Sequence, residues 1–352
     1  MDSRYLEDKE ELKSEERRVF LTAGIVGGAV AAGAVLAGAA HAQTQVAQAP
    51  APPFWPHPKW GKDDVAGASN WITPAKVLDA AKWIRDGKVH RIGRLYEAGM
   101  PKFGERAFTL RIPGGPTGGP FGANKLVYND EYLATEIGQT GTQFDGLGHI
   151  GIQMGKDGDK NEMRFYNGHT AQDINGPYGL AKIGIEHVKP FFTRGHLFDL
   201  KAHKGAMMEA GQEITLADLR ACLQKQNMQE ADVNEGDAVF FHTGWGELWM
   251  KNNDKYNGGA PGIGMEVGKW CIDKGICVVG ADTWPAEVVP NPNKDLAFPV
   301  HGELITKNCI FIHENMQFDS LVADRKYQFV YIFSPAPVKG ATGSNGGPIA
   351  VT

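Results

Sequence analysis

Residues 139–149 read QTGTQFDGLGH, and this short stretch decides how the chain is interpreted. Gln143 and Asp145 are two residues apart, so on an extended strand their side chains point to the same face. Glycines at positions 141, 146 and 148 leave room for a ligand or an ion against the backbone, and His149 follows on the glycine-rich turn. The stretch therefore predicts a carboxylate, a histidine and the amides of Gln139 and Gln143 around one point. A hydrogen-bonded strand end with a satisfied core histidine is the alternative.

A second polar group lies closer to the C-terminus. His301 stands within the sequence VHGE at residues 300–303, and Glu314 ends an expected apolar strand. A carboxylate at such a position is costly unless it is paired or bound to a metal ion. We therefore expect His301 and Glu314 to join Asp145 as three metal ligands.

The order of apolar and polar segments favours an α/β fold. Thr73-Pro74 opens a helix that Gly87 would end, and the sequence TLAD at residues 215–218 is typical of a capping box before a helix that runs toward Met228. A third helix is expected over 261–274, and strands over 238–241, 276–280, 309–312 and 328–333. Residues 112–124 are rich in glycine and proline and predict a long loop.

Composition excludes several classes of protein. The chain has 352 residues, 42% of them hydrophobic and 22% charged, which excludes a disordered chain and a multi-span membrane protein. The net charge of −5 argues against nucleic-acid binding, which normally needs a basic face. The four cysteines form no C-x-x-C pair, so we expect buried thiols and no zinc ribbon or disulfide framework.

The first 42 residues are typical of an export signal. Arg17 and Arg18 precede an uncharged, Gly/Ala-rich run over 19–40, and Ala40-His41-Ala42 is a small-x-small cleavage pattern. An uncleaved membrane anchor is the alternative. We expect a twin-arginine signal peptide at 1–42, a Pro-rich linker at 43–58 and one domain at 59–352. The twin-arginine export machinery would then deliver a periplasmic or secreted protein.

Taken together, the motifs resemble the family of metal-dependent cyclases and kynurenine formamidase-like hydrolases, which includes isatin hydrolase. The family motif H-x-G-T-H-x-D-x-x-x-H has the same spacing as residues 139–149 here. Further similar stretches are residues 242–245, 261–263, 280–283 with Glu287, 298–301, 314–315 and 339–344. The resemblance extends from about Trp60 to Val351.

The resemblance implies a swivelling β/β/α fold, with a mixed-strand, barrel-like core flanked by helices. It assigns Asp145, His301 and Glu314 to one metal site and His149 to acid–base catalysis. Both histidines of the family's other metal site are replaced, by Gln139 and Gln143. An amide oxygen is a neutral, hard ligand that suits zinc less well than imidazole does.

The two glutamines leave three alternatives open. In the first, the family's other metal site, at Gln139 and Gln143, is empty. In the second, the two glutamines help to hold a harder ion, water or the substrate. In the third, hydrolysis has been lost. We favour one divalent ion per chain, Mn²⁺ or Zn²⁺, with Mg²⁺ as a further option. Two carboxylates and a neutral histidine would balance its charge and leave open positions for water.

The resemblance further implies a hydrolase that cleaves the C–N bond of an aryl formamide, amide or cyclic amide. Metal-activated water would be the nucleophile and His149 the general base. The candidate substrate-contacting residues are Phe144, His242, Trp245, Trp284 and Glu287, although core packing explains the aromatic residues equally well.

Two other functions fit the same residues. One is a non-catalytic periplasmic small-molecule binding protein, and the other is lactone hydrolysis or a dehydration on the same metal site. The expected partners are a small-molecule substrate and, because related proteins are commonly oligomers, further copies of the chain.

Overall fold

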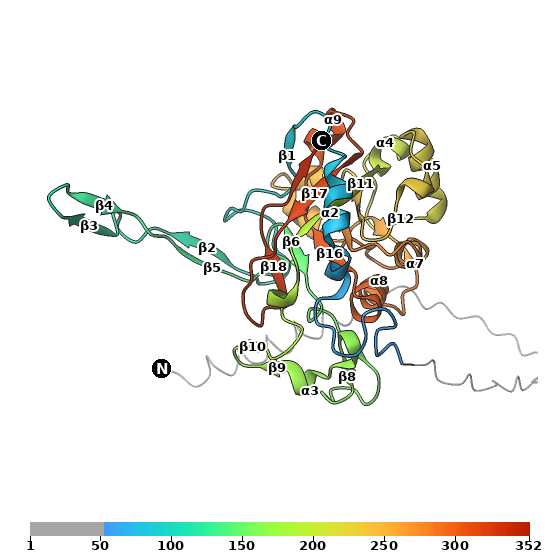
Figure 1. Cartoon of the computed structure of the whole chain (residues 1–352), viewed down its shortest axis with the longest axis horizontal. Helices are drawn as coiled ribbons and strands as arrows, with labels where there is room; N and C mark the ends of the chain where they lie inside the picture. Colours follow the sequence, from blue (N-terminus) through green and yellow to red (C-terminus); the bar gives the residue numbers. More distant parts are fainter. Residues whose placement is uncertain (1–52) are drawn as a thin grey trace, which may run out of the picture. The chain divides into compact units, whose positions relative to one another are not determined.

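The computed structural model describes residues 53–352, whose framework is a nine-stranded mixed sheet (Figure 1). In spatial order its strands are β1 (Val89–Arg91), β19 (Ile349–Val351), β17 (Gln328–Phe333), β11 (Phe191–Asp199), β13 (Ala238–His242), β15 (Val278–Ala281), β16 (Phe311–Glu314), β6 (Gln143–Asp145) and β18 (Gly343–Asn345). The four central strands β11, β13, β15 and β16 are parallel, and the strands on either side run antiparallel to their neighbours. The sheet curls into a half-barrel, which confirms the expected mixed-strand, barrel-like α/β core.

Successive side chains of the central strands enter two separate hydrophobic layers. Phe240 packs into one apolar cluster, whereas Val239 and Phe241 pack into the other. Helices α5 (Leu216–Lys225) and α7 (Met265–Asp273) supply apolar residues to the second cluster and so cover that face of the sheet. Both faces are therefore buried, as parallel strands require.

Helix α2 (Pro74–Ala81) packs against β11. It begins where the sequence predicts, because the Thr73 side chain accepts a hydrogen bond from the Lys76 amide, but it ends six residues before Gly87. The Thr215–Asp218 capping box of α5 is confirmed. Helix α7 starts at Met265 rather than at 261, because Gly262–Ile263 pairs as a strand with Glu213–Ile214.

Shorter elements complete the described chain. The helices are α3 (Ala171–Ile174), α4 (Leu200–Lys204), α6 (Asn253–Asn257), α8 (Pro299–His301), followed by a π-helical turn at Gly302–Lys307, and α9 (Asp319–Ala323). The two-stranded pairs are β7 (Ile152–Gln153) with β8 (Met163–Arg164), β9 (Asn175–Gly176) with β10 (Gly179–Leu180), and β12 (Glu213–Ile214) with β14 (Gly262–Ile263).

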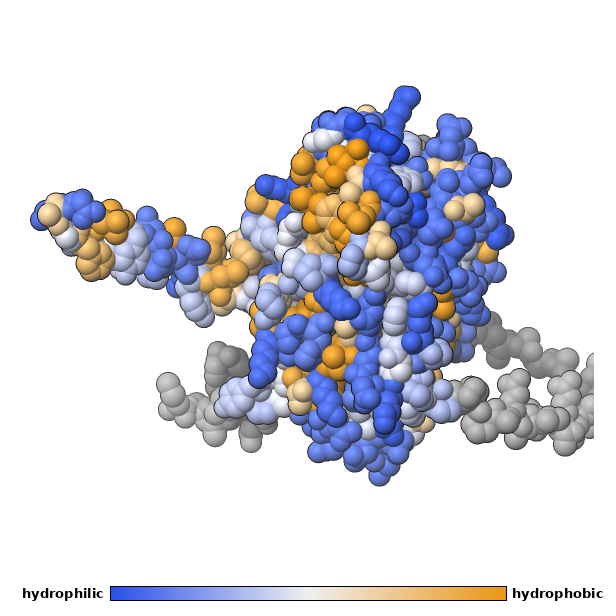
Figure 2. Space-filling model, viewed as in Figure 1, coloured by the Kyte–Doolittle hydropathy of each residue, from blue (hydrophilic) through white to orange (hydrophobic). Residues whose placement is uncertain are grey.

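The segment 108–135, here called the arm, extends away from the sheet as a long hairpin (Figure 1). Strand β2 (Phe108–Arg111) pairs with β5 (Tyr132–Thr135), and further out β3 (Gly118–Phe121) pairs with β4 (Leu126–Tyr128). The prediction of a loop over 112–124 is therefore wrong in part, because β3 lies inside it. Hydrophobic residues are spread along the arm (Figure 2).

The predicted signal peptide, 1–42, lies outside the described residues, as does the linker up to residue 52. The end of the predicted linker packs on the domain instead of extending from it. The His57 amide donates to the Asn167 side chain at 2.9 Å, and the Arg164 guanidinium lies over the ring of Trp55. Among the described residues, no helix is long and apolar enough to cross a membrane.

Candidate metal and catalytic site

Strands β6 and β16 bring distant parts of the sequence side by side. They pair antiparallel, with Gln143 opposite Glu314 and Asp145 opposite Ile312. The alternation of side chains therefore places Gln143, Asp145 and Glu314 on one face of the sheet. All three are buried, with exposed fractions of 0%, 2% and 0%. The same-face arrangement predicted for Gln143 and Asp145 is confirmed.

His301 reaches this cluster from the short helix α8, and Glu287 fixes its orientation. One carboxylate oxygen of Glu287 accepts hydrogen bonds from the His301 amide at 2.9 Å and from its Nδ1 at 2.5 Å. The other oxygen accepts from the amide of Val300. Nε2 of His301 then faces Glu314 Oε1 at 3.1 Å. Glu287, predicted to contact substrate, is thus a positioning residue for the histidine.

Asp145, His301 and Glu314 each present a ligand atom, and these atoms lie within 4.8 Å of one another. Asp145 Oδ2, Gln139 Oε1 and Gln143 Oε1 are buried with no hydrogen-bond partner among the described residues. Three carboxyl groups, counting Glu287, surround one imidazole. Unpaired oxygens and excess negative charge fit a divalent cation, and the oxygen-rich donor set favours a hard ion such as Mn²⁺ or Mg²⁺.

The two glutamines that replace histidines act as donors in this structure. The Nε2 groups of Gln139 and Gln143 each donate to Glu314 Oε2 at 2.7 Å. Gln143 Nε2 also lies 3.3 Å from Asp145 Oδ1. The amide nitrogens thus compensate part of the carboxylate charge, and rotating either amide by 180° would turn its oxygen into a cation ligand.

Proton affinities in the cluster reflect its burial and excess carboxylates. Burial and the nearby Asp145 charge raise the pKa of Glu314 to about 7. Burial alone would lower the pKa of His301, but its hydrogen bonds to Glu287 and Glu314 outweigh burial and raise that pKa to about 10. A metal ion would have to displace the proton on Nε2 in order to bind His301.

The backbone is strained around the cluster. Gln139, Phe298 and Asn315 have φ angles of 60°, 49° and 54°, in the left-handed region that non-glycine residues rarely adopt. Asn315 is held by its side chain, which donates to the Gly141 carbonyl and accepts from the Tyr256 hydroxyl. Strain of this kind persists where surrounding contacts hold it, and it is concentrated at functional sites.

His149 lies at the accessible edge of the cluster. Its Nε2 is 3.7 Å from Asp145 Oδ1, and its side chain is 24% exposed, whereas the three candidate ligands are at most 5% exposed. A group in this position can exchange protons with solvent and with a molecule bound beside Asp145. The structure therefore brings all of the predicted metal and catalytic residues together, namely Gln139, Gln143, Asp145, His149, His301 and Glu314.

The sequence matches the model of the Cyclase family over residues 44–288, which is more than half of the chain. The chain belongs to the Cyclase family. No curated protein matches it. A solved structure described as a novel cyclase is 32% identical to this chain, and the alignment covers 84% of this chain and 96% of the other, with a TM-score of 0.73.

Two isatin hydrolases A share the fold at lower identity. The enzyme from Ralstonia solanacearum is 17% identical, and the alignment covers 79% of this chain and 97% of the other, with a TM-score of 0.56. The enzyme from Labrenzia aggregata, solved with benzyl benzoate, is also 17% identical, and the alignment covers 75% of this chain and 93% of the other, with a TM-score of 0.54. At this identity the comparison shows the fold alone.

The structure places the remaining predicted substrate residues in different surroundings, and Phe144 lies furthest from expectation. Phe144 points away from the cluster into the core, where its ring contacts those of Phe191, Phe311, His313 and Phe333, so the structure does not bring it to the site. Strand alternation explains this, because its neighbours Gln143 and Asp145 occupy the opposite face.

Two further residues are held by structural hydrogen bonds. Trp245 is 1% exposed, and its indole donates to the Tyr256 carbonyl. His242 is buried and bonded through Nδ1 to Asp199. Among the described residues, no hydrogen bond, ion pair or ring contact joins Trp245 or His242 to the three candidate ligands.

Trp284 does lie in a row of rings that ends at the site. Its ring stacks on Phe103 at 4.7 Å and meets Phe298 edge-on at 6.1 Å, and Phe298 in turn meets the His301 ring at 5.7 Å. Sequence reasoning gave no role to Phe103 or Phe298. The sequence offered one signal for Phe298, because this residue directly precedes the proline that opens α8, the helix that carries His301.

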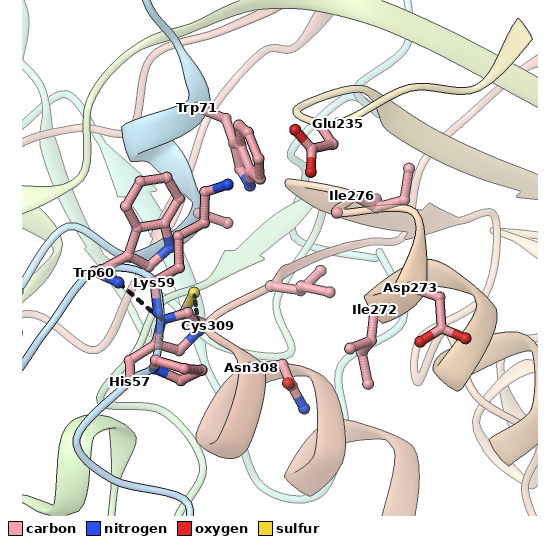
Figure 3. Close-up of a pocket in the computed structure, with 14 residues that line it drawn as sticks. His57, Lys59, Trp60, Trp71, Glu235, Ile272, Asp273, Ile276, Asn308 and Cys309 are labelled. Atoms are coloured by element: carbon pink, nitrogen blue, oxygen red, sulfur yellow. Dashed lines mark hydrogen bonds between the residues drawn. The ribbon is translucent and has the colours of Figure 1, made fainter.

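A separate pocket of about 220 Å³ is lined by His57, Trp60, Trp71 and Cys309 but by none of the predicted site residues (Figure 3). Nδ1 of His57 accepts from two backbone amides, so its Nε2 carries the hydrogen and faces Cys309 Sγ at 3.6 Å. Burial raises the pKa of this thiol well above its usual range. The thiol is therefore unreactive, and all four cysteines are buried and free as predicted.

Proposed function

We propose that this protein is a metal-dependent hydrolase that cleaves the C–N bond of an aryl formamide, amide or cyclic amide. The observation that carries the proposal is the group of unpaired buried oxygens of Gln139, Gln143 and Asp145, with the partly exposed His149 at its edge. Membership of the Cyclase family and the isatin hydrolase fold neighbours support a hydrolase.

Each residue then has a defined role. Asp145, His301 and Glu314 would hold one divalent ion, and Glu287 keeps the His301 ring in the orientation that points Nε2 at the cluster. Such an ion, when bound, acidifies water and polarises a carbonyl. His149 accepts a proton on the exposed side of Asp145 and returns it to the leaving nitrogen.

The row of rings supports an aromatic substrate. Trp284 and Phe298 are rigid, apolar surfaces that lead to His301, and Phe298 is 39% exposed, so part of it is free to contact a bound molecule. Aromatic rings pack favourably on such surfaces with centroids 4.5–7 Å apart. This arrangement suits an aryl group better than an aliphatic one.

A non-catalytic binding protein is the second candidate, and one observation favours it. The Gln139 and Gln143 amides already donate to Glu314, so they satisfy part of the charge that an ion would otherwise balance. Turnover separates the two functions, because a binding protein would saturate with ligand and release no product.

The experiment is a hydrolysis screen of the purified protein loaded with Mn²⁺ or Zn²⁺. An N-formyl aryl amine, a cyclic aryl amide and an aryl lactone serve as matched substrates. We expect metal-stimulated cleavage of at least one of the two amides. Turnover of the lactone alone would shift the assignment to C–O bonds, and saturable binding without turnover would establish the binding protein.

We also propose that the protein reaches the periplasm or the exterior through the twin-arginine machinery. The basis is the pair Arg17-Arg18 and the Ala40-His41-Ala42 pattern in the sequence. Mass spectrometry of the mature N-terminus in the exported fraction is the test. We expect Gln43 as the first residue, and an intact, membrane-retained N-terminus would contradict export with cleavage.

A further inference from the structure

We propose that the substrate of the candidate site is an aryl amide with an apolar acyl chain, and that this chain lies in a groove of about 510 Å³ beside the site. The groove, here called the acyl groove, is lined by apolar side chains that include Ile150, Ile152, Met265, Leu296 and Phe298. This substrate class rests on the proposed hydrolysis, and it selects an open-chain amide over a formamide or a cyclic amide.

The walls of the acyl groove belong to two segments that also carry site residues. Residues 150–152 directly follow His149, and Phe298 lies three residues before His301. The Phe298 ring meets the His301 ring edge-on at 5.7 Å and the Trp284 ring at 6.1 Å. Phe298 therefore belongs both to the groove and to the row of rings, so the groove is continuous with the place where we expect the aryl group.

Hydrogen bonds outside the acyl groove hold one of its walls in place. The Thr306 hydroxyl donates to the Ile150 carbonyl at 2.9 Å, and Ile152 pairs with Arg164 where β7 meets β8. A wall fixed in this way does not have to form when a ligand arrives, which lowers the cost of binding. The volume of the groove also lies within the range of about 300–1,000 Å³ that is typical of small-molecule pockets.

The charges of the acyl groove favour a neutral occupant. The charged residues that line it are Glu303 and Lys307, and they pair with each other at 2.7 Å. An ionic ligand would find no free counter-charge there, whereas an apolar chain gains from contact with the apolar lining. Leu296 and Phe298 are 46% and 39% exposed, so both have apolar surface that a bound chain can remove from water.

The acyl chain is the part of the substrate that fits this position. When the aryl group lies on the row of rings and the scissile carbonyl lies at the candidate metal site, the acyl chain is the substituent that remains. Full burial of one methylene group changes an affinity by about fourfold. Because the wall of the groove is itself partly exposed, we expect a gain of about two- to fourfold per methylene.

The test compares the butanoyl, hexanoyl and octanoyl amides of aniline as substrates of the purified protein loaded with Mn²⁺ or Zn²⁺. The three carbonyl groups have nearly the same intrinsic reactivity, so differences in kcat/KM report the contacts made by the chain. We expect kcat/KM to rise about two- to fourfold with each added methylene.

Two matched variants locate the effect. Leu296→Asp places a charge at the acyl groove and should lower kcat/KM for the octanoyl amide, relative to the butanoyl amide, by about tenfold or more. Leu78→Asp makes the same change at an exposed apolar position on α2, which does not line the groove, and should keep the wild-type increase.

Failure of the acyl groove and failure of the proposed reaction give different results. Cleavage of all three amides with equal or falling kcat/KM would overturn the groove and leave the hydrolase intact. If no amide is cleaved, the proposed reaction fails, and titration calorimetry with the same three amides tests the groove alone. Affinity that rises with chain length in the wild type but not in Leu296→Asp would support the groove as a binding site, and equal affinities would overturn it.

A segment of another protein chain is the alternative occupant of the acyl groove. In that case Leu296→Asp would change the sedimentation coefficient of the protein and leave the dependence on chain length as it is in the wild type. This result would overturn the proposal, because the groove would then not contact the substrate.

Discussion

Two buried histidine–carboxylate clusters in this protein look alike but differ in what completes them. In one, Asp237 accepts hydrogen bonds from His196 at 2.8 Å and from the Asn234 amide at 2.9 Å, and it is paired with Lys76 and Arg194. In the candidate site, Asp145, Glu287 and Glu314 surround His301, and Asp145 Oδ2 has no hydrogen-bond partner among the described residues.

The pKa values of Asp237 and Glu314 differ in the way that their surroundings predict. Burial acts to raise the pKa of Asp237, but the hydrogen bond and charge of His196 and the charge of Lys76 outweigh it, so its pKa lies below the ordinary value. The pKa of Glu314 is instead raised to about 7 by burial and by Asp145. Buried charge alone therefore does not mark a site. A buried cluster in which the carboxylates outnumber the cations does, because a bound cation would balance the excess negative charge.

The largest expected effect distinguishes catalysis from binding within the candidate site. His149→Ala should lower turnover by about 10² to 10⁴-fold, the usual contribution of a general base, without changing metal content. Steady-state kinetics and elemental analysis of the same sample measure the two quantities. His187→Ala, at a partly exposed histidine elsewhere, is the control. Unchanged turnover in the His149 variant would remove its acid–base role.

The next largest effect is expected on stability, at the Asp237 cluster, whose charges are paired. Asp237→Asn should lower the free energy of unfolding by about 3–5 kcal/mol, because Lys76 and Arg194 lose their buried counter-charge. Chemical denaturation measures this loss, and metal content should stay at the wild-type value. A loss of bound metal in this variant would mean that the two clusters are not independent.

The same residue predicts a pH dependence of stability. Because the pKa of Asp237 is lower in the folded state than its ordinary value of 3.8, the unfolded chain binds more protons in that interval. Its contribution is full above about pH 4 and is lost as the pH falls through the folded-state value. Denaturation midpoints between pH 5 and pH 3 should fall less steeply in Asp237→Asn than in the wild type, and equal slopes would contradict this.

A smaller effect is expected at the residue that orients His301. Glu287→Gln keeps the size of the side chain but weakens its hold on Nδ1, which should weaken metal binding by about 10 to 100-fold. Competition with a chelator of known affinity measures the change. Glu303→Gln, on the turn after α8, removes only a half-exposed pair with Lys307 and should leave the affinity unchanged.

The smallest effect concerns which ion is preferred. Restoring both family histidines, Gln139→His with Gln143→His, removes the two amide donors from Glu314 and adds imidazole ligands that suit zinc. We expect a shift in selectivity toward Zn²⁺ and a rise toward two ions per chain. Unchanged stoichiometry and selectivity would show that the glutamines do not determine the metal site.

Local patterns predicted much of the framework. The strand at Gln328–Phe333 is confirmed residue for residue, and the two-residue spacing of Gln143 and Asp145 correctly placed both on one face. Glu314 was identified because an acid that ends an apolar strand needs a partner. His301 was identified from the polar group at residues 300–303 and again from the family resemblance, but its approach through a helix of three residues and its orientation by Glu287 were not predicted.

Other features were beyond local reasoning for physical reasons. Phe144 is not one of them, because the alternation that places Gln143 and Asp145 on one face already predicts that the residue between them points to the opposite face, into the core. Phe103 and Phe298 are distant in sequence and meet only through Trp284. The hairpin in 108–135 escaped prediction because its outer strands are short, rich in Gly and Pro, and exposed on every side, which leaves no buried periodicity to detect.

The most direct test of the central claim is elemental mass spectrometry on three purified proteins: the wild type, Asp145→Asn and Asp237→Asn. The two substitutions make the same chemical change in the two clusters compared above. The account predicts about one divalent ion per chain in the wild type and in Asp237→Asn, and none in Asp145→Asn. A wild-type protein that binds no ion after reconstitution with Mn²⁺ or Zn²⁺, or an ion retained by Asp145→Asn, would contradict it.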